Sequence, residues 1–281
     1  MADREYVTSA AGVRMPRIIY GTAWKKTQTA DLVQTAIRMG FRGVDTAGQP
    51  KHYDEAGVGA GIAASLNDGL RRADIYLQTK FTPLSGHDPK RIPYDPKAPL
   101  AEQVAQSFAT STRNLRTDYV DCLILHSPLA SERQTAEVWQ ALERIVDNGG
   151  ARQLGISNCY SPTYLETLYR KVRVKPAVVQ NRFYAETNYD REIRAFCRQH
   201  GIIYQSFWTL SANPHVLADD RVTALASKYG RTPAQVLFRY LTQHDVIPLT
   251  GTKSETHMRE DLEIFDFELT QEELESVTTL F

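Results

Sequence analysis

The sequence has few cysteines, no excess of charge of either sign and no long hydrophobic run. Lys plus Arg and Asp plus Glu number 33 each, so no general positive field attracts nucleic acid or an anionic membrane surface. No apolar run reaches membrane-spanning length, and the first residues carry charges where a secretory signal would be apolar. We therefore expect neither nucleic-acid nor membrane binding, and we predict a cytoplasmic protein.

The cysteines narrow the expected chemistry further. Cys122, Cys159 and Cys197 are an odd number at wide, irregular spacing, with no CxxC pair. This pattern predicts neither a zinc site nor a redox motif. Cys122 falls in an apolar segment, where cysteine acts as a small core residue more often than as a catalytic thiol. We expect reduced cysteines and no bound metal.

What the chain does have is a regular alternation of short apolar segments with longer helical patterns, from about residue 18 to residue 265. This order predicts βα units around a parallel sheet. The expected strands are residues 18–22, 43–47, 75–80, 122–127, 153–158, 177–182, 202–207 and 246–251. Eight such strands predict a closed (β/α)8 TIM barrel of the α/β class, built as a single domain over residues 1–281.

The intervening segments carry helix signals. Residues 31–39, 104–115 and 132–146 have helical patterns, and Thr232-Pro233 offers an N-cap followed by a proline at the first helical position. Residues 4–16 alternate around Gly12, which predicts an N-terminal β-hairpin that closes the floor of the barrel.

Two further segments invite interpretation. Gly57, Gly59 and Gly61 resemble a nucleotide-binding glycine cluster, but they follow no strand and lack the full G-x-G-x-x-G pattern. We expect them to let a helix pack closely on the sheet.

Residues 83–99 are rich in proline and aspartate and are too long for an ordinary connection, so we expect this loop to lie beside the barrel mouth and to shape a substrate site.

Four polar residues stand at or just after the ends of successive apolar segments: Asp45, Tyr53, Lys80 and His126. A barrel brings the carboxyl ends of its strands together at one mouth, so these side chains are expected to meet there. A lysine held charged by a carboxylate would lower the pKa of the tyrosine and make it a proton donor. A neutral imidazole can donate to a carbonyl oxygen. The quartet therefore predicts a proton-transfer site.

Three residues of the quartet have a structural alternative, whereas Lys80 at the end of an apolar strand needs a partner. Alone, Asp45 favours a turn, Tyr53 is typical of a half-buried aromatic, and His126 is as typical of a hydrogen-bonded core residue as of a site. Two other functions also stay open: a lyase with Lys80 as a Schiff-base nucleophile, and a nicotinamide-binding sensor or scaffold with little turnover.

Several motifs together resemble the aldo-keto reductase superfamily: GFRGVDTA, Tyr53 before DEAGVGAGI, QTK at Lys80, DCLILHSP at His126, GISN at 155–158 and VVQN at Gln180. They occur in the family's order and cover nearly the whole chain. The resemblance implies hydride transfer from NADPH, with NADH possible, to an aldehyde or ketone. In that reaction Tyr53 is the general acid, Lys80 lowers its pKa, Asp45 pairs with Lys80, and His126 orients the carbonyl.

The resemblance also implies where the cofactor binds. Ser157, Asn158 and Gln180 would hold the nicotinamide carboxamide, Phe207 would stack on its ring, and the hydroxyl-rich loop at 250–254 would grip the 2′-phosphate. An ordinary helix N-cap is an equal alternative for any one residue of that loop. The full expected set of cofactor-binding residues is Thr22, Asp45, Ser157, Asn158, Gln180, Phe207, Leu210, Thr250, Gly251, Thr252, Lys253, His257 and Asp261.

The chain departs from the family pattern at several positions. His257 stands where an arginine is usual and Asp261 where an asparagine is usual, which weakens the preference for NADPH, although Arg259 offers compensation. Ser127 replaces a usual tryptophan, and the chain ends soon after its last helix. We therefore expect an open pocket whose residues are Trp24, Tyr53, His126, Ser127 and Trp208. The sequence leaves the physiological carbonyl and the oligomeric state open.

Overall fold

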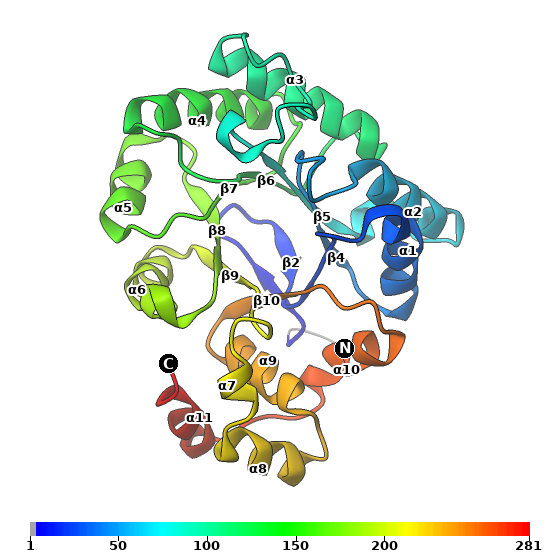
Figure 1. Ribbon diagram of the computed structural model, residues 1–281, viewed down its shortest axis with the longest axis vertical. Coiled ribbons are helices and arrows are strands. Elements are labelled where there is room, and N and C mark those ends of the chain that lie inside the picture. Colours follow the sequence, from blue (N-terminus) through cyan, green and yellow to red (C-terminus); the bar gives the residue numbers. More distant parts are fainter. Residues whose placement is uncertain (1–3) are drawn as a thin grey trace.

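A computed structural model describes residues 4–281, and residues 1–3 of the predicted domain lie outside the described part. Eight parallel strands close into a barrel in the order β10-β3-β4-β5-β6-β7-β8-β9 (Figure 1). The barrel strands are β3 (Ile19–Gly21), β4 (Gly43–Asp45), β5 (Tyr76–Phe81), β6 (Cys122–Leu125), β7 (Leu154–Ser157), β8 (Pro176–Arg182), β9 (Ile203–Phe207) and β10 (Val246–Thr250). All eight predicted strands are confirmed, with bounds that shift by at most two residues.

The helices surround the barrel as a ring (Figure 1). They are α1 (Thr29–Met39), α2 (Glu55–Asn67), α3 (Leu100–Leu115), α4 (Glu132–Asp147), α5 (Pro162–Lys171), α6 (Arg191–His200), α7 (Pro214–Leu217), α8 (Asp220–Tyr229), α9 (Pro233–Gln243), α10 (Glu255–Leu262) and α11 (Gln271–Thr278). The predicted N-cap of α9 is confirmed: Thr232 Oγ1 accepts from Gln235 N at 3.2 Å, and Gln235 Oε1 accepts from Thr232 N at 2.9 Å. This capping box fixes where α9 begins.

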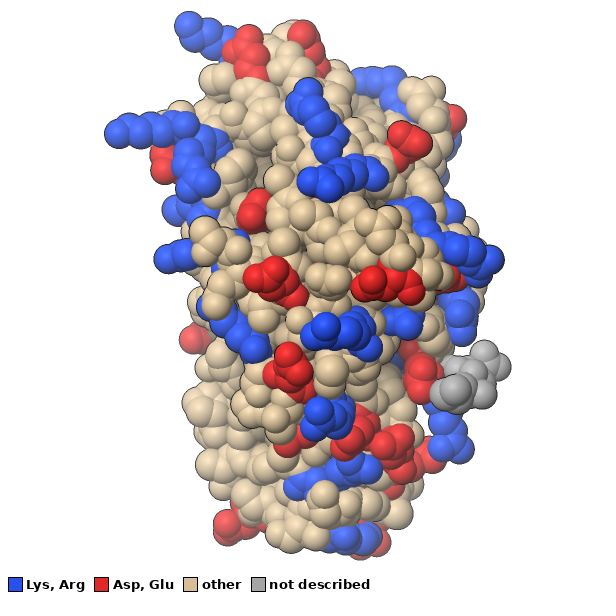
Figure 2. All heavy atoms as spheres, turned by 90° about the vertical axis from the view of Figure 1, so that its right-hand side faces the viewer, with Lys and Arg blue, Asp and Glu red and all other residues tan. Residues whose placement is uncertain are grey.

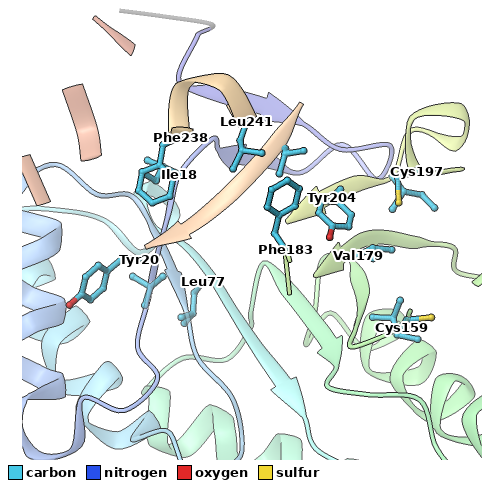
Figure 3. Packing of buried hydrophobic residues seen from close by; sticks show 14 of the residues in the cluster. Ile18, Tyr20, Leu77, Cys159, Val179, Phe183, Cys197, Tyr204, Phe238 and Leu241 are labelled. Atoms are coloured by element: carbon cyan, nitrogen blue, oxygen red, sulfur yellow. The ribbon is translucent and has the colours of Figure 1, made fainter. Parts of the chain in front are cut away.

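Apolar side chains between the barrel and the helices form the main core. Figure 3 shows a part of this layer, in which Val179 of β8, Tyr204 of β9 and Phe238 of α9 belong to one buried cluster. A second cluster lies at the opposite end of the barrel from the mouth. The predicted hairpin, β1 (Tyr6–Thr8) paired with β2 (Arg14–Pro16), places the fully buried Met15 in that second cluster. The hairpin thus closes the barrel floor, as predicted.

The glycines of α2 allow close packing, but the prediction that they face the sheet is wrong. A Cβ on Gly59 would overlap the backbone oxygen of Asn114 at the end of α3, and a Cβ on Gly61 would lie 2.5 Å from Ala30 O of α1. The glycines therefore let α2 approach the two neighbouring helices, whereas we expected them to face the sheet. The periodicity of one helix identifies a small-residue face, but it does not say which element fills that face.

The long connection after β5 lies beside the barrel mouth, as predicted. It contains a short 3-10 turn, Leu84–Gly86, whose carbonyl at Gly86 accepts from Gln49 Nε2 at 2.6 Å. Tyr94 folds back so that its hydroxyl donates to Thr82 O at 2.9 Å, just beyond β5. The Gln49 contact joins the connection to the loop that precedes Tyr53.

The outer surface carries mixed charges. On the face turned to the viewer in Figure 2, Lys and Arg side chains lie intermingled with Asp and Glu side chains. Within residues 4–281, no helix is long and apolar enough to cross a membrane.

Candidate active site

A buried ion pair forms the base of the barrel mouth. Asp45 ends β4 and Lys80 lies near the end of β5, and their exposed fractions are 2% and 1%. Lys80 Nζ donates to Asp45 Oδ1 at 2.6 Å, to Asp45 Oδ2 at 2.7 Å and to Thr46 O at 2.8 Å. An ammonium group has three N–H donors, so these three oxygens satisfy the full hydrogen-bonding capacity of Lys80.

Two glutamines donate to Asp45 from other strands, and a third glutamine accepts from both of them. Gln78 Nε2 and Gln180 Nε2 donate to Asp45 Oδ1 at 2.7 and 3.0 Å, and both also donate to Gln205 Oε1, at 2.8 and 2.9 Å. Gln205 Nε2 in turn donates to Gln78 Oε1 at 3.0 Å. Gln78 and Gln205 were absent from the predicted site, although a polar residue two positions before a site residue on the same strand faces the same side. That two-residue spacing was the available signal.

Tyr53 lies in the loop after β4, and its backbone N–H donates to Gln49 O at 3.0 Å. Lys80 Nζ lies 5.2 Å from the centre of its ring, and the ring centre lies 6.0 Å from that of His126. Burial and, to a lesser extent, the charge of Asp45 raise the pKa of Tyr53. This direction is opposite to the expected lowering by Lys80, because burial and Asp45 both favour the protonated phenol.

His126 follows β6 directly, and its ring plane makes an angle of 67° with the ring plane of Tyr53. Its Nδ1 lies 2.7 Å from the hydroxyl of Thr82, a partner that the sequence did not suggest. Burial, followed by the nearby charge of Lys80, holds the pKa of His126 well below its ordinary value. The imidazole is therefore neutral at neutral pH, as predicted. When Thr82 donates to Nδ1, Nε2 carries the remaining proton and can donate it to a substrate.

The residues expected at the nicotinamide lie at the ends of β7, β8 and β9. Ser157 pairs in register with Gln180, and Phe207 ends β9 with its side chain half-buried. Gln180 donates both amide protons inward, so its Oε1 is left to accept from a carboxamide. The side-chain amide of Asn158, in contrast, already bonds to other protein groups. Its Nδ2 donates to His126 O at 2.8 Å, and its Oδ1 accepts from the Tyr160 hydroxyl at 3.2 Å.

Two other expected cofactor residues lie beside these groups. Thr22 is buried after β3, and its hydroxyl donates to Asp45 O at 2.8 Å, which fastens the ends of β3 and β4 together. Leu210 is half-buried and packs on the main core. The acceptor on Gln180 and the half-buried ring of Phe207 fit a nicotinamide ring with its amide.

The loop after β10 brings cations together. Lys25 is 4% exposed, donates to Gly251 O, and has its pKa lowered to about 8 by burial and then by Lys253. Lys253 is exposed, and its Nζ donates to Gln28 at 3.0 Å. Thr252 O accepts from the Tyr20 hydroxyl at 2.9 Å. Two neighbouring lysines fit an anion such as phosphate, and Lys25 was missing from the predicted set.

The two α10 residues expected to bind the cofactor differ in their exposure to solvent. His257 is exposed in the first turn of α10, where its backbone N–H donates to Ser254 Oγ at 3.3 Å. Asp261 is buried and accepts from the Thr250 hydroxyl at 2.7 Å. Burial raises the pKa of Asp261 to about 6. The carboxylate therefore fixes the end of β10 to α10 and is not directed to solvent.

The expected substrate residues line the mouth with exposed aromatic surface. Trp24 is 55% exposed and Trp208 is 52% exposed, and both have left-handed backbones, with φ of 63° and 58°. Strained non-glycine residues of this kind occur preferentially at functional sites. Trp24 lies against His52, with ring centres 3.9 Å apart, and Ser127 is half-buried beside His126. The mouth thus has large flat surfaces that face solvent.

Comparison with known proteins places this site in a family. Residues 17–280 match the model of the Aldo/keto reductase family. The chain is 28% identical over 280 residues to a 9,11-endoperoxide prostaglandin H2 reductase of Trypanosoma cruzi, covering 98% of this chain and 90% of that protein. It is 29% identical over 272 residues to a glyoxal reductase of Bacillus subtilis, with coverages of 96% and 90%. The crystal structure of an aldo/keto reductase from Brucella melitensis superposes with a TM-score of 0.83 at 27% identity, covering 98% of this chain and 99% of that one. The chain belongs to the aldo/keto reductase family.

Proposed function

We propose that this protein reduces an aldehyde or ketone to the alcohol with NADPH, and that Tyr53 is the general acid. The family uses a nicotinamide nucleotide and acts on carbonyl groups. The observation that carries the finer proposal is the Asp45–Lys80 pair, whose ammonium lies 5.2 Å from the centre of the Tyr53 ring, beside His126. A glyoxal reductase among the relatives supports small reactive aldehydes as the first substrates to test.

In this proposal His126 and Tyr53 have separate roles in the reaction. His126 Nε2 donates to the carbonyl oxygen and orients it, and the Tyr53 hydroxyl gives its proton to that oxygen as the alcohol forms. The bound nicotinamide supplies the hydride. The raised pKa keeps Tyr53 protonated before the reaction. The phenolate that remains is stabilised by Lys80, 5.2 Å from the ring centre, until a proton from solvent replaces the one transferred.

Residues around the β10 loop support NADPH over NADH. Lys25 and Lys253 lie close enough for the charge of one to lower the pKa of the other, so an anion between them would relieve their repulsion. Exposed His257 and Arg259 stand on the first turns of α10, where a 2′-phosphate would also meet the helix N-terminus. NADPH is therefore expected to bind more tightly than NADH.

The test compares Tyr53→Phe with the wild type in NADPH consumption over a panel of reactive aldehydes. Removal of a general acid costs about 10²- to 10⁴-fold, so kcat should fall by that factor while NADPH still quenches tryptophan fluorescence. Tyr229→Phe is the matched control, because that hydroxyl donates to Glu273 on the outer helices. Undiminished activity in Tyr53→Phe would overturn the assignment.

The lyase alternative requires Lys80 as a neutral, accessible amine. Lys80 is 1% exposed and paired through both oxygens of Asp45, which opposes that role. Borohydride trapping of a substrate on Lys80 would revive the lyase. Turnover far below the usual enzyme range on every carbonyl would instead favour the sensor or scaffold.

A further inference from the structure

Arg182 occupies a prominent place at the barrel mouth. It is the last residue of β8 and pairs in register with Phe207, the last residue of β9. Side chains two apart on a strand face the same side, so Arg182 lies one layer above Gln180, just as Phe207 lies one layer above Gln205. Arg182 therefore stands on the side of the strand that carries the site.

Hydrogen bonds also join the backbone of Arg182 to the catalytic histidine. Its N–H donates to the Tyr160 hydroxyl at 3.2 Å, and that hydroxyl donates to Asn158 Oδ1 at 3.2 Å. Asn158 in turn donates to His126 O at 2.8 Å. The position of Arg182 relative to His126 is thus fixed by three successive hydrogen bonds.

The guanidinium of Arg182 has no polar partner in residues 4–281. It forms no ion pair and no side-chain hydrogen bond there, and its Nε is buried without an acceptor. Its neighbours are aromatic: the guanidinium carbon lies 4.0 Å from the ring centre of Trp208 and 5.0 Å from that of Tyr184. A buried donor without an acceptor is costly, which calls for a partner that the protein itself does not supply.

The chemistry of the cluster indicates what that partner is. Aromatic rings attract the faces of a guanidinium and leave its in-plane N–H groups available. Those N–H groups form a planar fork that matches the two oxygens of a carboxylate. Trp208 is 52% exposed, so it also offers an apolar surface next to the fork.

We propose that Arg182 determines substrate specificity by binding a carboxylate carried by the carbonyl substrate. This inference rests on the proposed carbonyl reduction and names its substrate class: aldehydes or ketones with a carboxylate at the end remote from the reacting carbon. The carboxylate pairs with the guanidinium fork while the carbonyl oxygen lies between Tyr53 and His126.

The test uses two aldehydes of nearly the same shape, 4-carboxybenzaldehyde and its neutral carboxamide analogue, 4-carbamoylbenzaldehyde. The measured quantity is the ratio of kcat/KM for the acid to kcat/KM for the amide, with NADPH saturating. The wild type should prefer the acid. In Arg182→Met the ratio should fall by about 10- to 100-fold, as expected for the loss of a charged hydrogen bond. Arg170→Met is the control, since Arg170 pairs with Glu166 on the outer helix α5.

The outcomes separate the two proposals. Failure of the wild type to oxidise NADPH with these two aldehydes and with every aldehyde of the panel refutes the proposed function. Equal ratios in the wild type and Arg182→Met, with turnover present, refute the role of Arg182 alone. A weaker Kd for NADPH that accounts for the whole loss assigns Arg182 to the cofactor and also refutes the proposal. If Arg182→Met does not fold, Arg182→Gln, which keeps a planar polar tip without the charge, should show the same fall in the ratio.

Discussion

Replacing Asp45 with asparagine tests the energetics of the buried pair. The change keeps the shape and the acceptor oxygen but removes the negative charge that faces Lys80 at 2.6 Å. Lys80 is 1% exposed and would remain as a buried cation without a counter-charge. Breaking a buried pair in this way costs about 3–5 kcal/mol of unfolding free energy, a large part of the roughly 5–15 kcal/mol that a protein typically has.

The penalty should depend on pH because Lys80 can lose its proton. Burial already lowers the pKa of Lys80, while Asp45 opposes that shift. Without Asp45 the native pKa of Lys80 falls further below the unfolded value, because the charge that opposed the effect of burial is gone. At a pH below the native pKa both the native and the unfolded state bind the proton, and the full penalty applies. At a higher pH the native state releases the proton, so the penalty shrinks by about 1.4 kcal/mol per pH unit.

Urea unfolding of Asp45→Asn and the wild type at pH 6, 7.5 and 9 measures this directly. Asp121→Asn is the matched control, because Asp121 is 4% exposed and pairs with Arg72 at 3.0 Å and Arg152 at 3.3 Å. An arginine keeps its proton throughout this range, so the Asp121→Asn penalty should be constant. If the Asp45→Asn penalty were equally constant, Lys80 would not be the uncompensated charge that the argument requires.

Two further changes test other parts of the molecule. Gly59→Ala should lower the unfolding free energy by about 1–3 kcal/mol in urea, because the new methyl group meets the rigid backbone of α3; an unchanged midpoint would contradict the close packing. Asp261→Asn should stabilise the protein by up to about 3 kcal/mol at pH 7.5. The native pKa of about 6 lies above the unfolded value, so wild-type stability is full below about pH 4 and is lost as the pH rises through 6. An equal gain at pH 4.5 and pH 7.5 would exclude this cause.

Local sequence patterns were sufficient to predict the barrel strands, the start of one helix and the four residues of the quartet. The repeated spacing of apolar segments predicted all eight barrel strands, and the Thr232-Pro233 signal predicted the start of α9. The quartet was found because strand ends of a parallel barrel meet at one mouth, and the structure brings Asp45, Lys80, Tyr53 and His126 together there. These features depend on residues close in the sequence or on a rule of the fold.

Partners distant in the sequence could not be predicted in the same way. Gln78 and Gln205 are 127 positions apart, and Thr82 reaches His126 across 44 positions, so no local pattern relates them. The direction of the Tyr53 pKa shift also depended on the burial of the phenol and on its proximity to Asp45, which only the packed mouth decides.

The sequence by itself determined the barrel, the order of its strands and the chemical types at its mouth, because hydrophobic periodicity and strand-end positions are local properties of the chain. Only the tertiary structure decided which of those groups are already paired and which are free. Lys80 is fully paired, whereas the guanidinium of Arg182 lies against aromatic rings and has no hydrogen-bond partner in the described part of the chain. Hydrogen bonding and burial depend on three-dimensional neighbours, and these determine what the site can bind.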